Sequence, residues 1–137
     1  MIALDTNILA RYYVRQQDAE GERQRSAVTE WISQQPALYV PKTVMLELEW
    51  VLRGVYGYGA AEIRRAFTHL IALANIVIED REEVETAIRA HQHGMDFADA
   101  LHQASARQCT ALATLDRTLA RRSQRLGLKP PVSVVAR

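Results

Sequence analysis

Short apolar runs alternate along the chain with longer segments whose apolar residues recur at helical spacing. Runs this short, bounded by polar or turn-forming residues, are typical of strands that are buried on both faces of a sheet. We therefore predict strands at residues 2–4, 38–40, 76–78, 111–113 and 132–135. The segments between them are amphipathic, which predicts helices that cover the sheet.

The predicted helices are bounded by capping and helix-breaking residues. The first helix follows the first strand directly, because Asp5, Thr6 and Asn7 can all cap a helix. Thr43 is the predicted N-cap of a helix whose apolar stripe comprises Val44, Leu48, Val51, Leu52 and Val55. Further helices are predicted at residues 28–32, 60–72, 82–93, 96–101 and 117–126.

This alternation of strands and helices predicts an α/β fold. We expect three layers, α/β/α, with a mostly parallel central sheet of four to five strands. A chain of 137 residues fits one compact domain, so residues 1–137 are expected to form a single domain. A hydrophobic content of 48% and a charged content of 24% are ordinary for a globular protein.

Several classes of protein are disfavoured by what the sequence lacks. Cys109 is the only cysteine, so an intrachain disulfide and a thiolate metal site are excluded, and we expect Cys109 to be a small buried residue. No apolar stretch approaches the roughly 20 residues of a membrane-spanning helix. The first residues also lack the basic and apolar regions of a signal peptide. We therefore expect a cytoplasmic protein without a membrane partner.

Acidic residues stand at equivalent positions after several predicted strands. Asp5 directly follows the first strand, Glu47 lies in the first turns of the helix after the second, and Asp116 follows the fourth within three residues. Ligands of parallel sheets bind beyond the carboxyl ends of the strands. Carboxylates gathered there repel one another unless a divalent cation neutralises them. The pattern therefore predicts a metal-dependent site.

Each of these acids also has a structural interpretation. Asp5 and Asp116 could simply cap the helices that follow them. Glu47 and Glu49 lie about 200° apart around a helix, so only one of them can face a given pocket. The apolar stripe borders Glu47, which favours Glu47 for the pocket and places Glu49 toward solvent.

Asp96 and Asp99 lie on one side of the helix that they begin. With Asp96 as N-cap and Asp99 at the third helical position, the pair would resemble a capping box. That role accounts well for Asp96. Asp99 is flanked by apolar residues, so its charge needs a partner, which a metal ion would supply.

The net charge of +1 conceals an uneven distribution of charge. Residues 79–99 carry seven acids and two bases, whereas the residues after 100 carry one acid and seven bases. An acidic pocket bordered by arginines suits a polyanionic substrate whose phosphate is held through a metal. The alternative is that these arginines are solvated helix residues.

Four motifs together resemble those of the PIN-domain nucleases, and among them the small VapC-type toxins of bacterial toxin–antitoxin pairs. They are Ile2-Ala3-Leu4-Asp5-Thr6-Asn7, Val44-Met45-Leu46-Glu47-Leu48, Asp96-Phe97-Ala98-Asp99-Ala100-Leu101 and Ala113-Thr114-Leu115-Asp116. Each motif alone is weakly specific, but the four occur in order, at the expected spacing, over essentially the whole chain.

The resemblance implies a PIN-like fold and a specific set of functional residues. Its acidic positions fall on Asp5, Glu47, Asp99 and Asp116, and its supporting polar positions on Thr6, Asn7 and Thr114. Similar proteins bind Mg²⁺ or Mn²⁺ and cleave RNA, commonly form homodimers, and are inhibited by a small VapB-like antitoxin. The implied function is that of an endoribonuclease toxin of a type II toxin–antitoxin pair.

The chemistry of these residues suits that function. Mg²⁺ takes oxygen ligands and retains several waters. We expect Asp5 and Asp99 to contact the metal directly, and Glu47 and Asp116 to complete the site through water or a second ion. Candidates for binding the substrate backbone are Arg117, Arg121 and Arg122.

Two other functions compete with this one. A haloacid-dehalogenase-type phosphatase would need a second aspartate two residues after the first, where Asn7 stands, and the only lysines are Lys42 and Lys129. A catalytically inactive PIN-fold scaffold or RNA-binding module is the other alternative, against which four intact acids argue. A toxin would also need an apolar groove for its antitoxin, and the candidate linings, which could equally be core residues, are Tyr12, Trp31, Trp50 and Tyr56.

Overall fold

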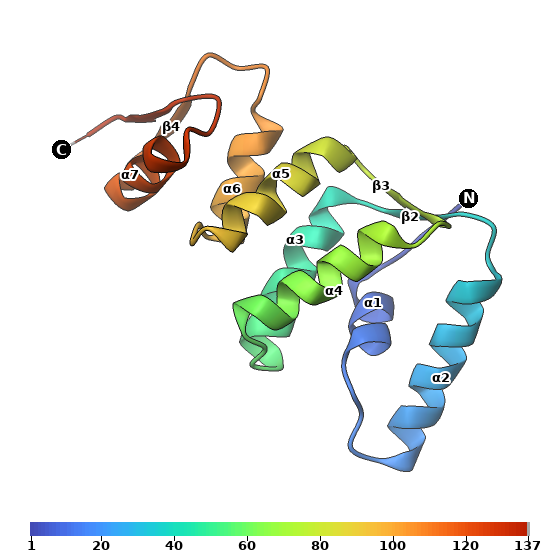
Figure 1. Cartoon of the computed structure of the whole chain (residues 1–137). Helices are drawn as coiled ribbons and strands as arrows, with labels where there is room; N and C mark the ends of the chain where they lie inside the picture. The colour runs from blue at the N-terminus through green and yellow to red at the C-terminus, as the bar shows by residue number, and fades with distance from the viewer. Residues whose placement is uncertain (137) are drawn as a thin grey trace. The chain divides into compact units, whose positions relative to one another are not determined.

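The computed structural model describes residues 1–136, and Arg137 lies outside the described part. The chain divides into two compact units, Met1–Arg81 and Glu82–Arg137, each of which contains a small parallel sheet and the helices that cover it (Figure 1). No helix within residues 1–136 is long and apolar enough to cross a membrane.

A parallel sheet of three strands, in the order β1-β2-β3, forms the centre of the first unit. The strands are β1 (Ile2–Ala3), β2 (Leu38–Val40) and β3 (Ile76–Ile78). Leu38 of the central strand lies opposite Ile2 on one side and Ile76 on the other. Leu38 and Val40 are completely buried, as expected for an apolar strand between two others.

Five helical segments accompany this sheet. They are α1 (Thr6–Tyr13), α2 (Ala19–Gln34), α3 (Lys42–Trp50), the π-helix η1 (Val51–Val55) and α4 (Ala60–Ala72). Helix α1 contacts both α2 and α3, and α4 contacts β3. In α4, Ile63, Phe67 and Leu70 recur at helical spacing and are completely buried, so they form the face that α4 turns to the core.

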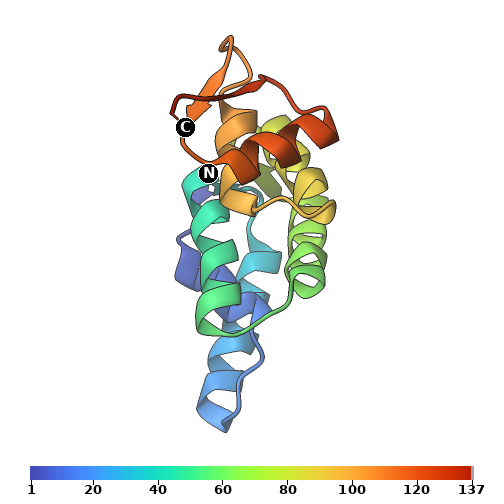
Figure 2. The ribbon, with the colours of Figure 1, turned by 90° about the vertical axis from the view of Figure 1, so that its left-hand side faces the viewer.

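The second unit contains the remaining helices and a two-stranded parallel sheet. Its elements are α5 (Arg81–Gln92), α6 (Phe97–Ser105), β4 (Leu112–Thr114), α7 (Arg117–Leu126) and β5 (Val132–Val134). Helix α7 lies against β5 (Figure 2) and ends at Gly127, whose φ of +65° suits glycine. The side-chain amide of buried Gln103 donates to Ser123 Oγ (2.6 Å) and to the Pro130 carbonyl (2.7 Å), which ties α6 to α7 and the loop after it.

The predicted α/β class is confirmed, and the five strands within residues 1–136 all lie in parallel pairs. The strands nevertheless form two small sheets rather than one of four to five strands. Each strand has only two or three residues, so each pair exchanges few hydrogen bonds. That residues 1–137 act as a single domain stays a prediction.

Two local predictions were wrong. Pro41, not Thr43, is the N-cap of α3 and makes no side-chain cap bond. Instead, the Lys42 backbone N–H donates to Glu79 Oε1 (2.7 Å), so a residue next to β3 satisfies the start of α3. Cys109 is exposed rather than buried, because it lies in the turn between α6 and β4.

Candidate active site

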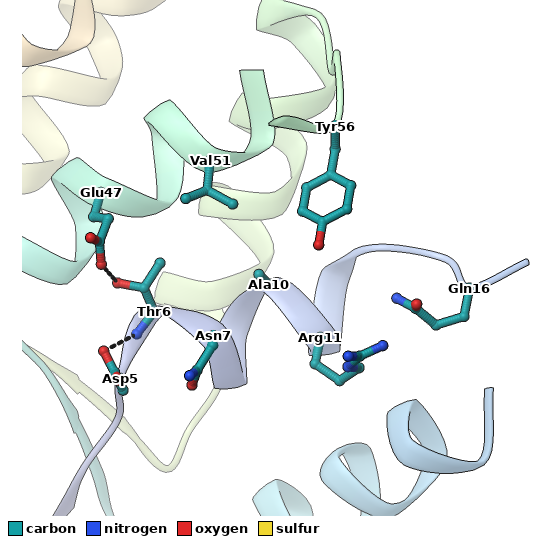
Figure 3. Close-up of a pocket in the computed structure, with 9 residues that line it drawn as sticks. All are labelled: Asp5, Thr6, Asn7, Ala10, Arg11, Gln16, Glu47, Val51 and Tyr56. Atoms are coloured by element: carbon teal, nitrogen blue, oxygen red, sulfur yellow. Dashed lines mark hydrogen bonds between the residues drawn. The ribbon is translucent and has the colours of Figure 1, made fainter. Parts of the chain in front are cut away.

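A pocket of about 410 Å³ opens in the first unit beside α1 and the α3–η1 segment. Its lining combines carboxylates, a hydroxyl, amides, a guanidinium and a phenol (Figure 3). The lining residues are Asp5, Thr6, Asn7, Ala10, Arg11, Gln16, Glu47, Val51 and Tyr56. Thus the first unit places four sequence-predicted site residues, Asp5, Thr6, Asn7 and Glu47, in one pocket.

Asp5 is the N-cap of α1, but its cap bond is unusual. Its Oδ1 accepts a hydrogen bond from the backbone N–H of Thr6 (2.8 Å), the first residue of the helix. An ordinary cap bonds to the second or third N–H. Asp5 is exposed, and its Oδ2 has no hydrogen-bond partner among residues 1–136. Helix capping therefore leaves one oxygen of Asp5 available to a ligand.

Thr6 connects the two carboxylates of the pocket. Its side chain is buried, and its hydroxyl donates a hydrogen bond to Glu47 Oε1 while its backbone N–H donates to Asp5 (Figure 3). Glu47 is exposed apart from this contact. The two bonds of Thr6 hold Asp5 and Glu47 at the same end of the pocket.

The prediction that Glu49 points toward solvent was wrong. Glu49 is only 4% exposed, and its Oε2 accepts from Arg53 Nε (2.8 Å). The buried stripe of this segment comprises Met45, Leu48, Glu49 and Leu52. Because Glu49 occupies a position of this stripe, it is buried with the apolar residues, whereas Val55, which the sequence placed in the stripe, is 59% exposed.

In the second unit, Asp96 caps α6 as predicted. Its Oδ1 accepts from the backbone N–H of Asp99 (3.0 Å), which places Asp99 at the third position of the helix. Asp96 is exposed and Asp99 is half-buried. The bond accounts for Asp96 as a cap but leaves both side-chain oxygens of Asp99 without a hydrogen bond among the described residues.

Burial raises the pKa of the Asp99 carboxyl above its ordinary value, and the negative charges of Asp96 and Asp116 raise that pKa further. His102 and Arg122 act in the opposite direction. Asp99 therefore lies close enough to two other acids to be repelled by them. This repulsion favours the protonated form of Asp99, and a bound cation would remove it.

Asp116 is a regular N-cap of α7. Its Oδ1 accepts from the backbone N–H groups of Thr118 (2.9 Å) and Leu119 (3.2 Å). The Asp116 backbone N–H in turn donates to Thr114 Oγ1 (3.0 Å), so Thr114 supports the turn that presents Asp116. Only one oxygen of Asp116 is used, and its Oδ2 has no hydrogen-bond partner among residues 1–136.

The arginines of α7 are exposed. Arg117, Arg121 and Arg122 make no ion pair with any residue that the structure describes, and Arg121 donates only to Thr118 Oγ1 (3.2 Å). Their charges are therefore available to a ligand.

The sequence model of the PIN domain family matches residues 2–124 of this chain. The chain belongs to the PIN domain family. No curated protein matches the chain. PIN domains are generally nucleases, which supports a ribonuclease role, and the nucleases among them usually depend on divalent metals.

The acids of this PIN domain fit a divalent metal by their chemistry. Four carboxylates each keep at least one oxygen without a hydrogen bond among residues 1–136: those of Asp5, Glu47, Asp99 and Asp116. Hard cations such as Mg²⁺ take oxygen ligands. Within either unit, however, no three or more His, Cys, Asp or Glu side chains are arranged to hold an ion among the described residues.

Sequence reasoning missed two lining residues of the pocket in this PIN domain, Arg11 and Gln16, and considered Tyr56 only for a different surface. One signal for Arg11 was present, because it lies four residues after Asn7 and so shares its side of α1. For Tyr56 no local signal existed, because its position depends on the π-helix that precedes it.

Proposed function

We propose that this PIN domain is a Mg²⁺- or Mn²⁺-dependent endoribonuclease that hydrolyses RNA phosphodiester bonds. The observation that carries the proposal is the pair of carboxylates, Asp5 and Glu47, held by Thr6 at one end of a pocket. Membership of a family of nucleases supports the choice of reaction over that of a phosphatase.

The proposal assigns the catalytic role to Asp5, Glu47, Asp99 and Asp116. Asp5 and Asp99 would contact the metal directly, and Asp116 would complete the site through water or a second ion. When bound, the metal would lower the pKa of a water molecule and offset charge on the phosphoryl oxygens. The free oxygens of Asp5 and Asp116, and the raised pKa of Asp99, support these assignments.

Glu47 is the residue that we assign to the attacking water. Thr6 occupies its Oε1, so its Oε2 is the oxygen that can accept a hydrogen bond or a proton from water. Thr6 and Asn7 support this end of the pocket, and Thr114 supports Asp116. The exposed Arg117, Arg121 and Arg122 would bind the RNA backbone as counter-charges to phosphate.

We also propose that the protein is the toxin of a type II toxin–antitoxin pair. It would then act in the cytoplasm, form a homodimer and bind a VapB-like antitoxin. Of the four candidate aromatic residues, Trp50 and Tyr56 are 56% and 47% exposed. Tyr12 and Trp31 are half-buried, so they have less area to offer a partner.

Two measurements on purified protein test the nuclease. Mn²⁺ is titrated by calorimetry into the wild-type protein and into Asp5→Asn, and cleavage of RNA is followed with Mn²⁺ and with EDTA. We expect wild-type binding and metal-dependent cleavage, both lost in the variant. Metal binding by neither protein, or cleavage that persists in EDTA, would refute the metallonuclease, and RNA binding without cleavage would favour the inactive scaffold.

Expression of the protein alone in a bacterial host tests the toxin. We expect growth arrest with wild-type protein and normal growth with Asp5→Asn at an equal level of protein. Normal growth with confirmed wild-type protein would refute the toxin role and leave the nuclease untouched.

A further inference from the structure

The pocket of the first unit extends well beyond its acids. Asp5, Thr6 and Glu47 lie at one end, and Tyr56, Arg11 and Gln16 lie at the other (Figure 3). The first end is acidic, whereas the second presents a cation, an aromatic ring and an amide. The two ends therefore suit different parts of one ligand.

A π-helix places Tyr56 at this second end. Helix α3 continues into η1 without a break, and the Tyr56 backbone N–H closes the wider turn onto the Val51 carbonyl (3.2 Å). Val51 and Tyr56 both line the pocket, and Gly57, at φ +70°, ends the helix immediately afterwards. A π-turn within a helix is rare and is frequent at functional sites, so its presence here calls for a role for Tyr56.

The polar groups at this end make few hydrogen bonds or ion pairs with the residues that the structure describes. Neither the Arg11 guanidinium nor the Tyr56 hydroxyl makes a hydrogen bond or ion pair with residues 1–136, and Tyr56 is 47% exposed. Gln16 is held in place, because its Nε2 donates to the Val14 carbonyl (2.8 Å), and its Oε1 is left as an acceptor. A charge, a ring face and an acceptor are thus all available to a ligand.

We propose that Tyr56 and Arg11 form a nucleotide subsite for single-stranded RNA, in which the base stacks on Tyr56 and Arg11 binds an adjacent phosphate. The subsite rests on the proposed ribonuclease function, because it takes RNA as the ligand of the same pocket. Gln16 Oε1 accepts a hydrogen bond from the base edge. A volume of about 410 Å³ lies within the range of about 300–1,000 Å³ for small-ligand sites.

The RNA must be unpaired at this nucleotide. A base can stack on a protein ring only when it has left the stack of its own helix, as bases in single strands and loops do. Stacking on Tyr56 is tolerant of sequence, since every base has a π face. The subsite therefore selects an unpaired nucleotide near the acids rather than a particular base.

Binding is measured by fluorescence anisotropy of a short labelled single-stranded RNA in EDTA, where metal-dependent cleavage cannot occur. The variants are Tyr56→Leu, Tyr56→Trp and Arg11→Gln. Trp50→Leu, an exposed aromatic of the same helical segment outside the pocket, and Arg65→Gln, an exposed arginine of α4, are the matched controls. A second RNA carries an abasic nucleotide in place of each base in turn.

Tyr56→Leu is expected to bind the intact RNA about 5- to 100-fold more weakly, and Tyr56→Trp to bind it as tightly as wild type, because the stacking surface is retained. One abasic RNA should bind wild type weakly and lose its sensitivity to Tyr56→Leu. Arg11→Gln should weaken binding and reduce the slope of log affinity against log salt by about 0.7. Both controls should bind like wild type.

Equal binding of intact RNA by Tyr56→Leu, Arg11→Gln and wild type would overturn the subsite, and so would wild-type binding too weak to detect in EDTA. Weakening in Tyr56→Leu that is the same for every abasic RNA would also overturn it. These outcomes are independent of cleavage. Failure of the nuclease appears instead as intact RNA in Mn²⁺ with binding in EDTA preserved.

Discussion

The hydroxyl of Thr6 donates a hydrogen bond to Oε1 of Glu47, and this bond joins the first turn of α1 to the second turn of α3. The backbone N–H of Thr6 binds Asp5 as well. One buried residue thus controls the positions of two acids that lie 42 residues apart in the chain.

Thr6→Val keeps the shape of the side chain but removes its donor. Because Glu47 is exposed and water can replace the bond, the free energy of unfolding should fall by only about 0.5–1.5 kcal/mol. RNA cleavage should fall about 10- to 100-fold, which is more than the loss of stability alone would cause, because the Glu47 carboxylate is no longer held for general base catalysis. Urea unfolding and cleavage assays at saturating Mn²⁺ measure both effects.

Thr6→Ser is the control, since it retains the hydroxyl and should retain most of the activity. If Thr6→Val cleaves RNA as fast as wild type, the bond has no catalytic importance.

Asp5→Asn should separate capping from metal binding. Asparagine caps a helix about as well as aspartate, so urea unfolding of the metal-free protein should change by less than about 0.5 kcal/mol. Mn²⁺ binding should be lost, because an amide oxygen carries no charge. Asp18→Asn is matched to it, since Asp18 caps α2 through Gly21 (2.7 Å) and does not line the pocket. Comparable Mn²⁺ affinity in the two variants would contradict the role of Asp5.

Asp99→Asn should stabilise the metal-free protein at neutral pH. The folded state raises the pKa of Asp99 above its ordinary value of 3.8. This carboxyl therefore favours folding when it is protonated, and that contribution is lost as the pH rises through the raised pKa. The variant should gain in stability relative to wild type as the pH rises from below 3.8 to 7, as measured by urea unfolding in EDTA.

Addition of Mn²⁺ should make wild type more stable than Asp99→Asn, because the ion binds the wild-type carboxylate and not the amide. A variant that is less stable than wild type at pH 7 in EDTA would show that Asp99 is not under electrostatic strain.

Glu49→Leu should retain RNA cleavage, whereas Glu47→Leu should lose it. Glu49 lies in the buried stripe between Leu48 and Leu52, and the side chain of Arg53 is 53% exposed, so water can solvate its guanidinium. The large cost of breaking a buried ion pair comes from the charge that is left buried, and Arg53 is not buried, so we expect a gain of about 0–2 kcal/mol in urea unfolding with cleavage retained. Glu47→Leu should fold and lose cleavage. Loss of cleavage in Glu49→Leu, with folding intact, would assign Glu49 a role in the site.

Local chemistry made much of the secondary structure predictable. Helices α4 and α7 were predicted with the bounds that the structure shows, and so were β2 and β3. Their apolar residues recur regularly and their ends carry strong signals, such as Gly127 after α7. The capping hydrogen bond from the Asp99 backbone N–H to the Asp96 carboxylate was likewise predictable, because both residues belong to the same turn.

Nonlocal contacts decided what the pattern could not. The start of α3 is satisfied by Glu79, which lies 37 residues away from Lys42, so no local motif reveals it. To predict that Glu49 is buried, one must know which side of α3 packs against the rest of the first unit. The π-turn of η1 changes the helical spacing after Val51, which moves Val55 out to solvent and Tyr56 into the pocket.

The sequence by itself determined the α/β class, the order of the elements and the acids worth testing, because periodicity, caps and turn residues act over a few neighbouring positions. Only the tertiary structure decided that Thr6 holds Glu47 beside Asp5, and that Arg11 and Tyr56 complete their pocket. Those relationships depend on how α1 meets the α3–η1 segment, and packing between elements distant in the chain leaves no local trace in the sequence.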